Sequence, residues 1–335
     1  MFTATSWALS SSDDEILVGG QAVIEGVMMR SPKGYSVAVR RQDGTIRTMK
    51  DILLTLGEKW KLFKIPVLRG VGVLAQALVL GIRALRFSAE EALGEEAAKK
   101  EVKHERSECE PDAQRKRDSA QPQERAQPSI KDPGQVSSWL IAGNLVLALG
   151  INILLFVALP LLITRAVQTQ IGFQSSILFN GIDGIFRVLV FVIFLYVVSW
   201  MKDMNRVFQY HGAEHKTVYN FEAREDLKVA NAKKFSTLHP RCGTSFLLVV
   251  MIVSIFVFSI AHFDTLAAKL LSRIVLLPLV AGISYEIIRY SAKHPKSLLR
   301  IVTLPGLLLQ KITTKEPDET QLEIAIRALE EALTV

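Results

Sequence analysis

The stretch from Trp139 to Ile163 contains no charged residue, and it constrains the fold more than any other feature of the sequence. At about 1.5 Å of rise per residue, a helix of this length can cross the roughly 30 Å hydrocarbon core of a bilayer. Hydrophobic residues make up 49% of the chain and are concentrated in such runs. We therefore expect a mainly α-helical, polytopic membrane protein.

Apolar runs of similar length follow at three further places, which predicts about four transmembrane helices. The expected spans are residues 138–164 and 178–201, within segment 137–203, and residues 244–263 and 266–290, within segment 243–291. The second span contains Asp183 and Arg187. Their spacing lets the two side chains pair along one helix face, which lowers their cost in lipid.

The distribution of lysine and arginine predicts the orientation of these helices. Only Arg165 lies between the first two spans, whereas the loop 204–242 and the tail 292–335 are rich in basic residues. Because basic residues collect in cytoplasmic loops, we expect a multi-pass protein of the cell membrane. Both termini and the 204–242 loop are expected in the cytoplasm.

The same bias accounts for the net charge of +7 without a nucleic-acid partner. A basic chain can bind nucleic acid, but no nucleic-acid motif occurs and no aromatic residues are interleaved with the basic ones. The expected partners are the lipid bilayer and proteins that bind the cytoplasmic elements. The motifs leave the oligomeric state open.

Residues 1–48 contain short β-prone runs separated by turn residues, which predicts a small cytoplasmic β-element. Residues 49–93 have helical spacing of their apolar residues, with Pro66 as a break, and predict amphipathic or interfacial helices. The charge-free part of 67–87 is short for a span. A true span there is the alternative, and it would invert the topology.

The remaining segments are more polar. Residues 94–136 are dense in charged residues, glutamine and proline, and predict a disordered cytoplasmic linker. The run 298–309 is interrupted by Pro305 and Gly306 and is too short to span. The tail is expected to close with an amphipathic surface helix over 316–333.

The sequence His211-Gly-Ala-Glu214-His215 carries the strongest chemical signal. On a helix, His211 and His215 lie one turn apart on one face, where two imidazoles can bind the same metal ion. The order H-x-x-E-H matches the inverted zincin motif, in which the glutamate is a general base. Glu214 is therefore the candidate catalytic residue, although Gly212 weakens the expected helix.

A catalytic zinc site has three protein ligands and one open position. The candidates that could complete the site, for zinc or another divalent metal, are Glu222, His239, Cys242 and Glu286. If His211, His215, His239 and Cys242 all bind, the site is closed and structural. The competing interpretations are a polar helix with two exposed histidines, and a Glu286 carboxylate at the membrane boundary that pairs with Arg289 or Lys293.

Several blocks of this sequence together resemble the YqhQ-like family of bacterial membrane proteins. They are GGQAVIEGVMMRSP at 19–32, YHGAEHK at 210–216, HPRCGTSF at 239–246, PLVAGISYEIIR at 278–289 and PGLLLQKITTKEP at 305–317. The family is described as a domain of unknown function and is sometimes labelled a predicted metal-dependent enzyme. The resemblance implies a multi-pass bacterial membrane protein with a metal site.

Two functions are consistent with these features. The first is a metal-dependent hydrolase at the cytoplasmic membrane face, with Glu214 as base. The second is a non-catalytic membrane scaffold or assembly factor, in which the histidine and cysteine residues form a structural zinc site. The motifs name neither the substrate nor the metal.

Overall fold

A computed structural model describes seven parts of the chain: residues 18–53, 65–108, 146–148, 150–240, 242–260, 266–294 and 300–335. Most of the helix expected after residue 49, the beginning of the first expected span and the linker residues 109–136 lie outside these parts.

The expected β-element is present as a four-stranded antiparallel sheet with the strand order β1-β2-β3-β4. The strands are β1 (Gly19–Val23), β2 (Gly26–Arg30), β3 (Gly34–Arg40) and β4 (Ile46–Ile52). The helix predicted from residue 49 is wrong for Met49–Ile52, because these residues complete β4 by pairing with β3. Gly44, in the turn before β4, has a φ of 85°, a conformation that glycine adopts readily.

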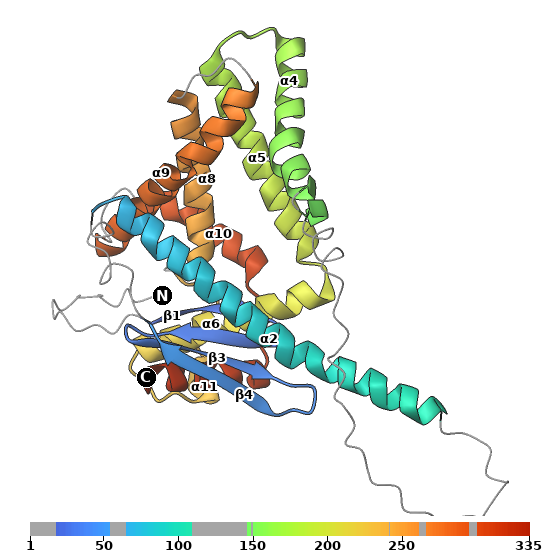
Figure 1. The fold of residues 1–335 in the computed structure, drawn as a ribbon. Coiled ribbons are helices and arrows are strands. Elements are labelled where there is room, and N and C mark those ends of the chain that lie inside the picture. The colour runs from blue at the N-terminus through green and yellow to red at the C-terminus, as the bar shows by residue number, and fades with distance from the viewer. Residues whose placement is uncertain are drawn as a thin grey trace, which may run out of the picture.

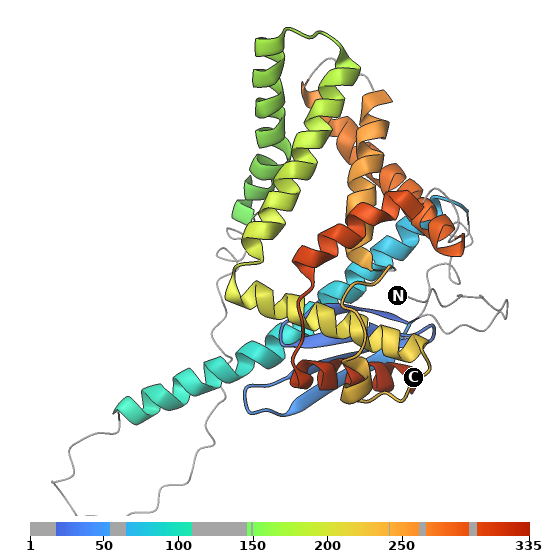
Figure 2. The ribbon, with the colours of Figure 1, turned by 180° about the vertical axis from the view of Figure 1, so that it is seen from behind.

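Both faces of the sheet are buried, and alternate residues of each strand point to opposite faces. Val27, Met29 and Ala38 pack against helices α6 (Lys202–Glu222) and α11 (Glu319–Leu333). Met28 and Val37, together with other residues of their face, pack against helix α2 (Leu68–Glu108). Figures 1 and 2 show the resulting three layers, with α2 on one side of the sheet and α6 and α11 on the other.

The sheet and the helices packed on it form one layered unit, the sheet body. Its segments are far apart in the sequence. The sheet lies near the N-terminus, α6 and the short helix α7 (Val229–Ala232) follow the second expected span, and α11 is C-terminal. A network at the β1–β2 turn links two of them: Glu25 pairs with Arg206 and accepts a hydrogen bond from the Tyr210 hydroxyl at 3.3 Å. Burial, reinforced by Glu25, raises the pKa of Tyr210.

The C-terminal helix α11 differs from the predicted surface helix, because it is a core element. Its residues Leu322, Ile326 and Leu329 are buried against the sheet and α6. The helix begins with a capping box in which Asp318 and Gln321 satisfy each other's backbone N–H groups. These three residues belong to the apolar stripe that the sequence predicts, whereas its fourth residue, Leu333, is exposed. The partner of the stripe cannot be predicted from the tail alone.

Four described helical segments are long and apolar enough to cross a membrane: residues 68–92, 146–171, 177–198 and 243–260. The last three match the first three expected spans. They comprise the π-helical turn η2 (Leu154–Ala158) with α4 (Leu159–Ile171), α5 (Ser176–Val198) and α8 (Gly243–Ile260). The expected fourth span, 266–290, is helical as α9 (Leu266–Lys293) but is not among the four.

Helix α2 differs from the prediction in two ways. It contains a candidate span, and it continues to Glu108, so the predicted disordered linker is wrong for residues 94–108. However, Leu80 and Ala84 of α2 are buried in the core beneath the sheet, and Figure 1 shows α2 running obliquely between the sheet and the other long helices. This packing favours the interfacial placement over a membrane crossing.

One ion pair and one close contact stand out among the long helices. Asp183 and Arg187 pair within α5 at 2.7 Å, as their spacing predicted. Helix α10 (Arg300–Thr313) runs without a break through Pro305 and Gly306, contrary to the predicted interruption. A Cβ atom at Gly306 would lie 2.6 Å from Ser245, so this glycine allows α10 to cross close to α8.

The core position of α11 can be tested with two leucines of the same helix. Leu322 is fully buried and Leu333 is 37% exposed. Replacing Leu322 with alanine leaves a cavity and is expected to lower the free energy of unfolding by about 2–5 kcal/mol. Leu333→Ala is the matched control, with an expected change of about 0.5 kcal/mol or less. Thermal unfolding of the detergent-purified proteins measures both, and equal effects would contradict a core role for α11.

Candidate metal centre

Helix α6 positions the histidine pair. It begins at Lys202, directly after the turn that ends the membrane-spanning helix α5, and runs unbroken to Glu222. His211 and His215 lie one turn apart on it, with ring centroids 4.5 Å apart. His215 is 1% exposed and His211 is largely buried, so the interpretation as two exposed histidines on a polar helix is wrong.

Each histidine is oriented by a backbone carbonyl. His211 Nδ1 lies 2.8 Å from the carbonyl oxygen of Thr313, and His215 Nδ1 contacts that of Thr237. Because a carbonyl can only accept, both Nδ1 atoms carry a proton, so in the neutral rings the Nε2 atoms hold the lone pairs that can bind a metal. This arrangement is typical of metal-binding histidines, whose second nitrogen is held by a hydrogen bond.

Cys242 supplies a third donor atom from another element. It directly precedes helix α8, and its Sγ lies 3.2 Å from His211 Nε2. The backbone N–H and the hydroxyl of Thr244 lie 3.4 and 3.1 Å from the same sulfur. Helix N-termini stabilise thiolates, the form of cysteine that binds metals.

The three donors converge closely enough to share one ion. The nitrogen and sulfur atoms of His211, His215 and Cys242 all lie within 4.8 Å of one another. In a tetrahedral zinc site, with bonds of about 2.0–2.3 Å, such atoms are roughly 3.3–3.6 Å apart. His215 Nε2 is buried and has no hydrogen-bond partner among the described residues, an arrangement that is costly unless something binds there. These residues fit a divalent metal ion.

Glu214 lies beside the three donors. Its Oε2 is 3.8 Å from His211 Nε2 and 3.9 Å from His215 Nε2, which is close but beyond hydrogen-bond length. The side chain is 7% exposed and packs under β1. A Cβ atom at Gly20 would lie 2.8 Å from Glu214 Cγ, so the glycine of β1 makes room for this carboxylate.

Gly212 has a structural role that the sequence interpretation missed. A Cβ atom there would lie 2.0 Å from the carbonyl oxygen of Lys315. The missing side chain therefore allows the segment Thr313–Lys315 to lie against α6, where the N–H of Lys315 donates to the carbonyl of Phe208 at 2.9 Å. The same segment presents the carbonyl that orients His211.

His239 and Glu222, both predicted as candidate ligands, form a pair with each other. His239 Nε2 lies 3.2 Å from Glu222 Oε1, and the His239 ring is 5.7 Å from the His215 ring. The buried Gln310 holds the backbone of His239 with two hydrogen bonds, one to its N–H and one to its carbonyl. The pair thus adjoins the candidate metal-binding group, which consists of His211, His215 and Cys242, without belonging to it.

Glu286 lies in a different environment from the other candidates. Its two carboxylate oxygens pair with the guanidinium group of Arg69, and one accepts a long hydrogen bond from the N–H of Val67. This ion pair links α9 to the beginning of α2. The alternative interpretation, an ion-paired carboxylate, is confirmed, but the predicted partners Arg289 and Lys293 are wrong, because the cation is Arg69 of α2.

Three further residues support the centre and were not identified from the sequence. Thr237 and Thr313 act through their backbone carbonyls, so their side chains carry no signal. Gln310 is a buried amide in the block PGLLLQKITTKEP, and a polar residue within an apolar run is the signal that could have identified it.

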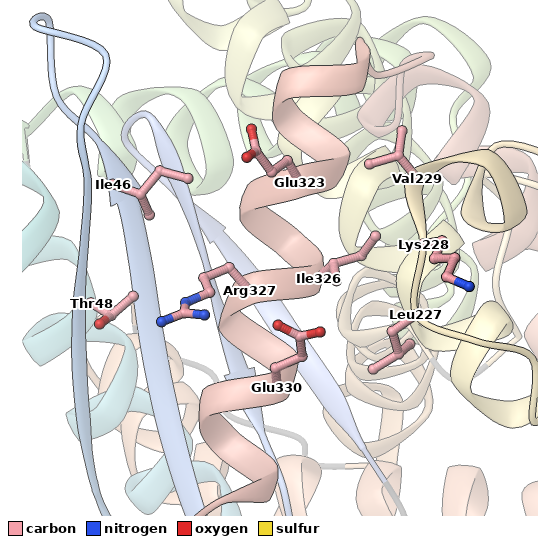
Figure 3. Close-up of a pocket in the computed structure, with 9 residues that line it drawn as sticks. All are labelled: Ile46, Thr48, Leu227, Lys228, Val229, Glu323, Ile326, Arg327 and Glu330. Atoms are coloured by element: carbon pink, nitrogen blue, oxygen red, sulfur yellow. The ribbon is translucent and has the colours of Figure 1, made fainter.

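A separate hollow of about 590 Å³ lies on the sheet body, alongside α11. Figure 3 shows Ile46 and Thr48 of β4 on one side and Leu227 to Val229 on the other, with Glu323 and Arg327 between them. It contains no histidine or cysteine, and it carries side chains of both charges. It therefore adds nothing to the metal-binding group.

The close approach at Gly212 yields a test. Gly212→Ala is expected to displace the segment Thr313–Lys315 and so remove the hydrogen bond that orients His211. We expect at least a tenfold loss of divalent-metal affinity, within the range seen when outer hydrogen bonds of metal ligands are removed. Ala213→Gly is the control: it makes the opposite exchange at the next residue of α6 and so shows how much a change in helix propensity alone affects the affinity. Unchanged affinity in Gly212→Ala would contradict this role.

Comparison with known proteins places the chain in a family. Residues 65–335 match the family model described as "Protein of unknown function (DUF1385)". The chain is 32% identical over 319 residues to the "Uncharacterized protein YqhQ" of Bacillus subtilis (strain 168), covering 94% of this chain and 92% of that protein. No solved structure matches it. The chain belongs to the DUF1385 family and is a YqhQ-like protein.

Proposed function

We propose that this protein is a metal-dependent hydrolase that works at the cytoplasmic face of the cell membrane. His211, His215 and Cys242 hold the metal, for which zinc is the best candidate, since mixed imidazole and thiolate ligands suit it. The observation that carries the proposal is the convergence of three donor atoms, from His211, His215 and Cys242, within 4.8 Å of one another. Both histidines are oriented by backbone carbonyls at Nδ1, and the buried Nε2 of His215 has no partner among the described residues.

Three protein donors leave one position of a tetrahedral site open, which is the arrangement of catalytic zinc centres. A zinc ion bound there would supply a Lewis acid that polarises a carbonyl or phosphoryl oxygen. Glu214 is placed to accept a proton from an attacking water in the space between the donors, because its Oε2 is nearly equidistant from both Nε2 atoms. It can then deliver that proton to the leaving group.

The location of the centre favours a substrate at the membrane surface. The histidine helix α6 directly follows α5, and the cysteine directly precedes α8, so both elements are tied to candidate membrane spans. The orientation with this centre in the cytoplasm rests on the basic residues of 204–242 and 292–335.

The second candidate function is a scaffold with a structural metal site. It requires a fourth protein ligand, and His239 is the nearest candidate because its ring adjoins that of His215. His239 would have to leave Glu222, to which its Nε2 is now directed. For that reason we favour the open, catalytic site.

Metal content tests the ligand set. We expect about one zinc ion per chain in the wild type, and less than a tenth of that in His211→Ala, His215→Ala and Cys242→Ser. Glu286→Gln is the control, because Glu286 pairs with Arg69, and it should retain the metal. Elemental analysis of proteins purified without added chelator measures these contents. Metal-free wild-type protein, or equal content in the ligand variants, would refute the proposed centre.

Replacing Glu214 with glutamine separates the two functions. The exchange preserves shape and removes the base, so we expect normal metal content and a melting temperature close to that of the wild type. Complementation of a deletion phenotype should be lost, since general-base catalysis contributes about 10²–10⁴-fold to rate. If Glu214→Gln complements fully while the ligand variants lose thermal stability, the scaffold function is favoured instead.

A further inference from the structure

We propose that a hollow at the junction of α5, α6 and α10 binds the phosphate headgroup of an anionic glycerophospholipid. The hollow has a volume of about 460 Å³. It is lined by Tyr196, Ser199, Trp200, Asn205, Lys311 and Lys315, among others. None of these residues belongs to the metal-binding group.

The hollow lies where a membrane-spanning helix ends. The candidate span of α5 ends at Val198, and after a short turn α6 sets off in a transverse direction, as Figure 2 shows. Tyr196 and Trp200 stack edge to face at this end, with ring centroids 5.2 Å apart, and are 51% and 71% exposed. Exposed tyrosine and tryptophan at helix ends are typical of the membrane–water interface.

Two lysines give the hollow its charge. Lys311, in the last turn of α10, and Lys315 both line the hollow, and neither has an acidic partner within the described parts of the chain. Nearby lysines do have such partners: Lys216 pairs with Glu316, and Lys233 pairs with Glu319. The two lysines of the hollow are thus available for an anion from outside the chain.

This combination fits a lipid headgroup better than a soluble phosphate. Basic pockets between helices on the cytoplasmic side bind phosphorylated headgroups. Two ammonium groups can neutralise one phosphate, the Asn205 amide can donate to a glycerol oxygen, and the aromatic rings can border the glycerol backbone and the first methylene groups. A soluble phosphate has no apolar part that could pack against the aromatic rings.

The hollow also adjoins the segment that orients His211. Lys315 contributes its side chain to the hollow and its carbonyl oxygen to the close contact with Gly212. A bound headgroup would therefore hold the segment Thr313–Lys315 against α6. The proposal itself is independent of any bound metal, and it is tested without one.

Lipid retention by the full-length protein in non-ionic detergent tests the proposal. Native mass spectrometry would count lipids bound per chain while phosphatidylglycerol or phosphatidylcholine is titrated. We expect the wild type to retain phosphatidylglycerol in preference to phosphatidylcholine. Lys311→Gln/Lys315→Gln should weaken phosphatidylglycerol retention on the order of tenfold or more, given the contribution of each lysine near an anionic lipid.

The double exchange Lys228→Gln/Lys234→Gln is the matched control, because it removes the same charge from exposed lysines of the sheet body. It should leave retention unchanged. Equal retention of the two lipids by the wild type, or unchanged retention in Lys311→Gln/Lys315→Gln, would overturn the proposal. Displacement of phosphatidylglycerol by an equal concentration of glycerol phosphate would assign the hollow to a soluble phosphate and overturn the lipid assignment.

Discussion

A close contact between helix α6 and the segment Thr313–Lys315 joins the long helices, the sheet body and the candidate metal centre. It exists because residue 212 has no side chain, so that the carbonyl of Lys315 can lie against the helix. On one side of the contact α10 ends, next to α8. On the other side the chain enters α11, which completes the core of the sheet body. The same contact orients His211 through the carbonyl of Thr313. One backbone segment therefore joins the long helices to the sheet body and sets the geometry of the candidate metal centre.

The centre lies at the boundary between two kinds of structure. Its histidines belong to a helix that is buried against the sheet, and its cysteine stands at the beginning of an apolar helix. Such a site cannot form until both parts have come together, because no single segment carries all three donors. The buried Nε2 of His215 has no partner among the described residues, which is unfavourable, so metal binding at this point would also stabilise the junction. A lipid headgroup at Lys311 and Lys315 would act on the same junction from the membrane side.

Features that depend on neighbouring residues could be predicted from the sequence. Features that depend on contacts between distant segments could not. The spacing of His211 and His215 identified one helix face correctly, since neighbours along a helix are a property of the sequence alone. Glu286 was ambiguous because its partner, Arg69, lies on a helix more than two hundred residues away in the chain. The spacing of Met49 and Ile52, three residues apart, fits a helix, and only the pairing of these residues with β3 shows that they belong to a strand. Helix propensity alone marks Gly212 as a weak point of α6. Its structural role is the close contact with the distant Lys315, which propensity cannot reveal.

X-ray absorption at the zinc edge would test the central claim most directly, because it reports the atoms around the metal in the intact protein. We expect a first shell of two imidazole nitrogens at about 2.0–2.1 Å, one sulfur at about 2.3 Å and one further light atom from solvent. A first shell without sulfur, or one with a third imidazole in place of the solvent atom, would contradict an open centre formed by His211, His215 and Cys242.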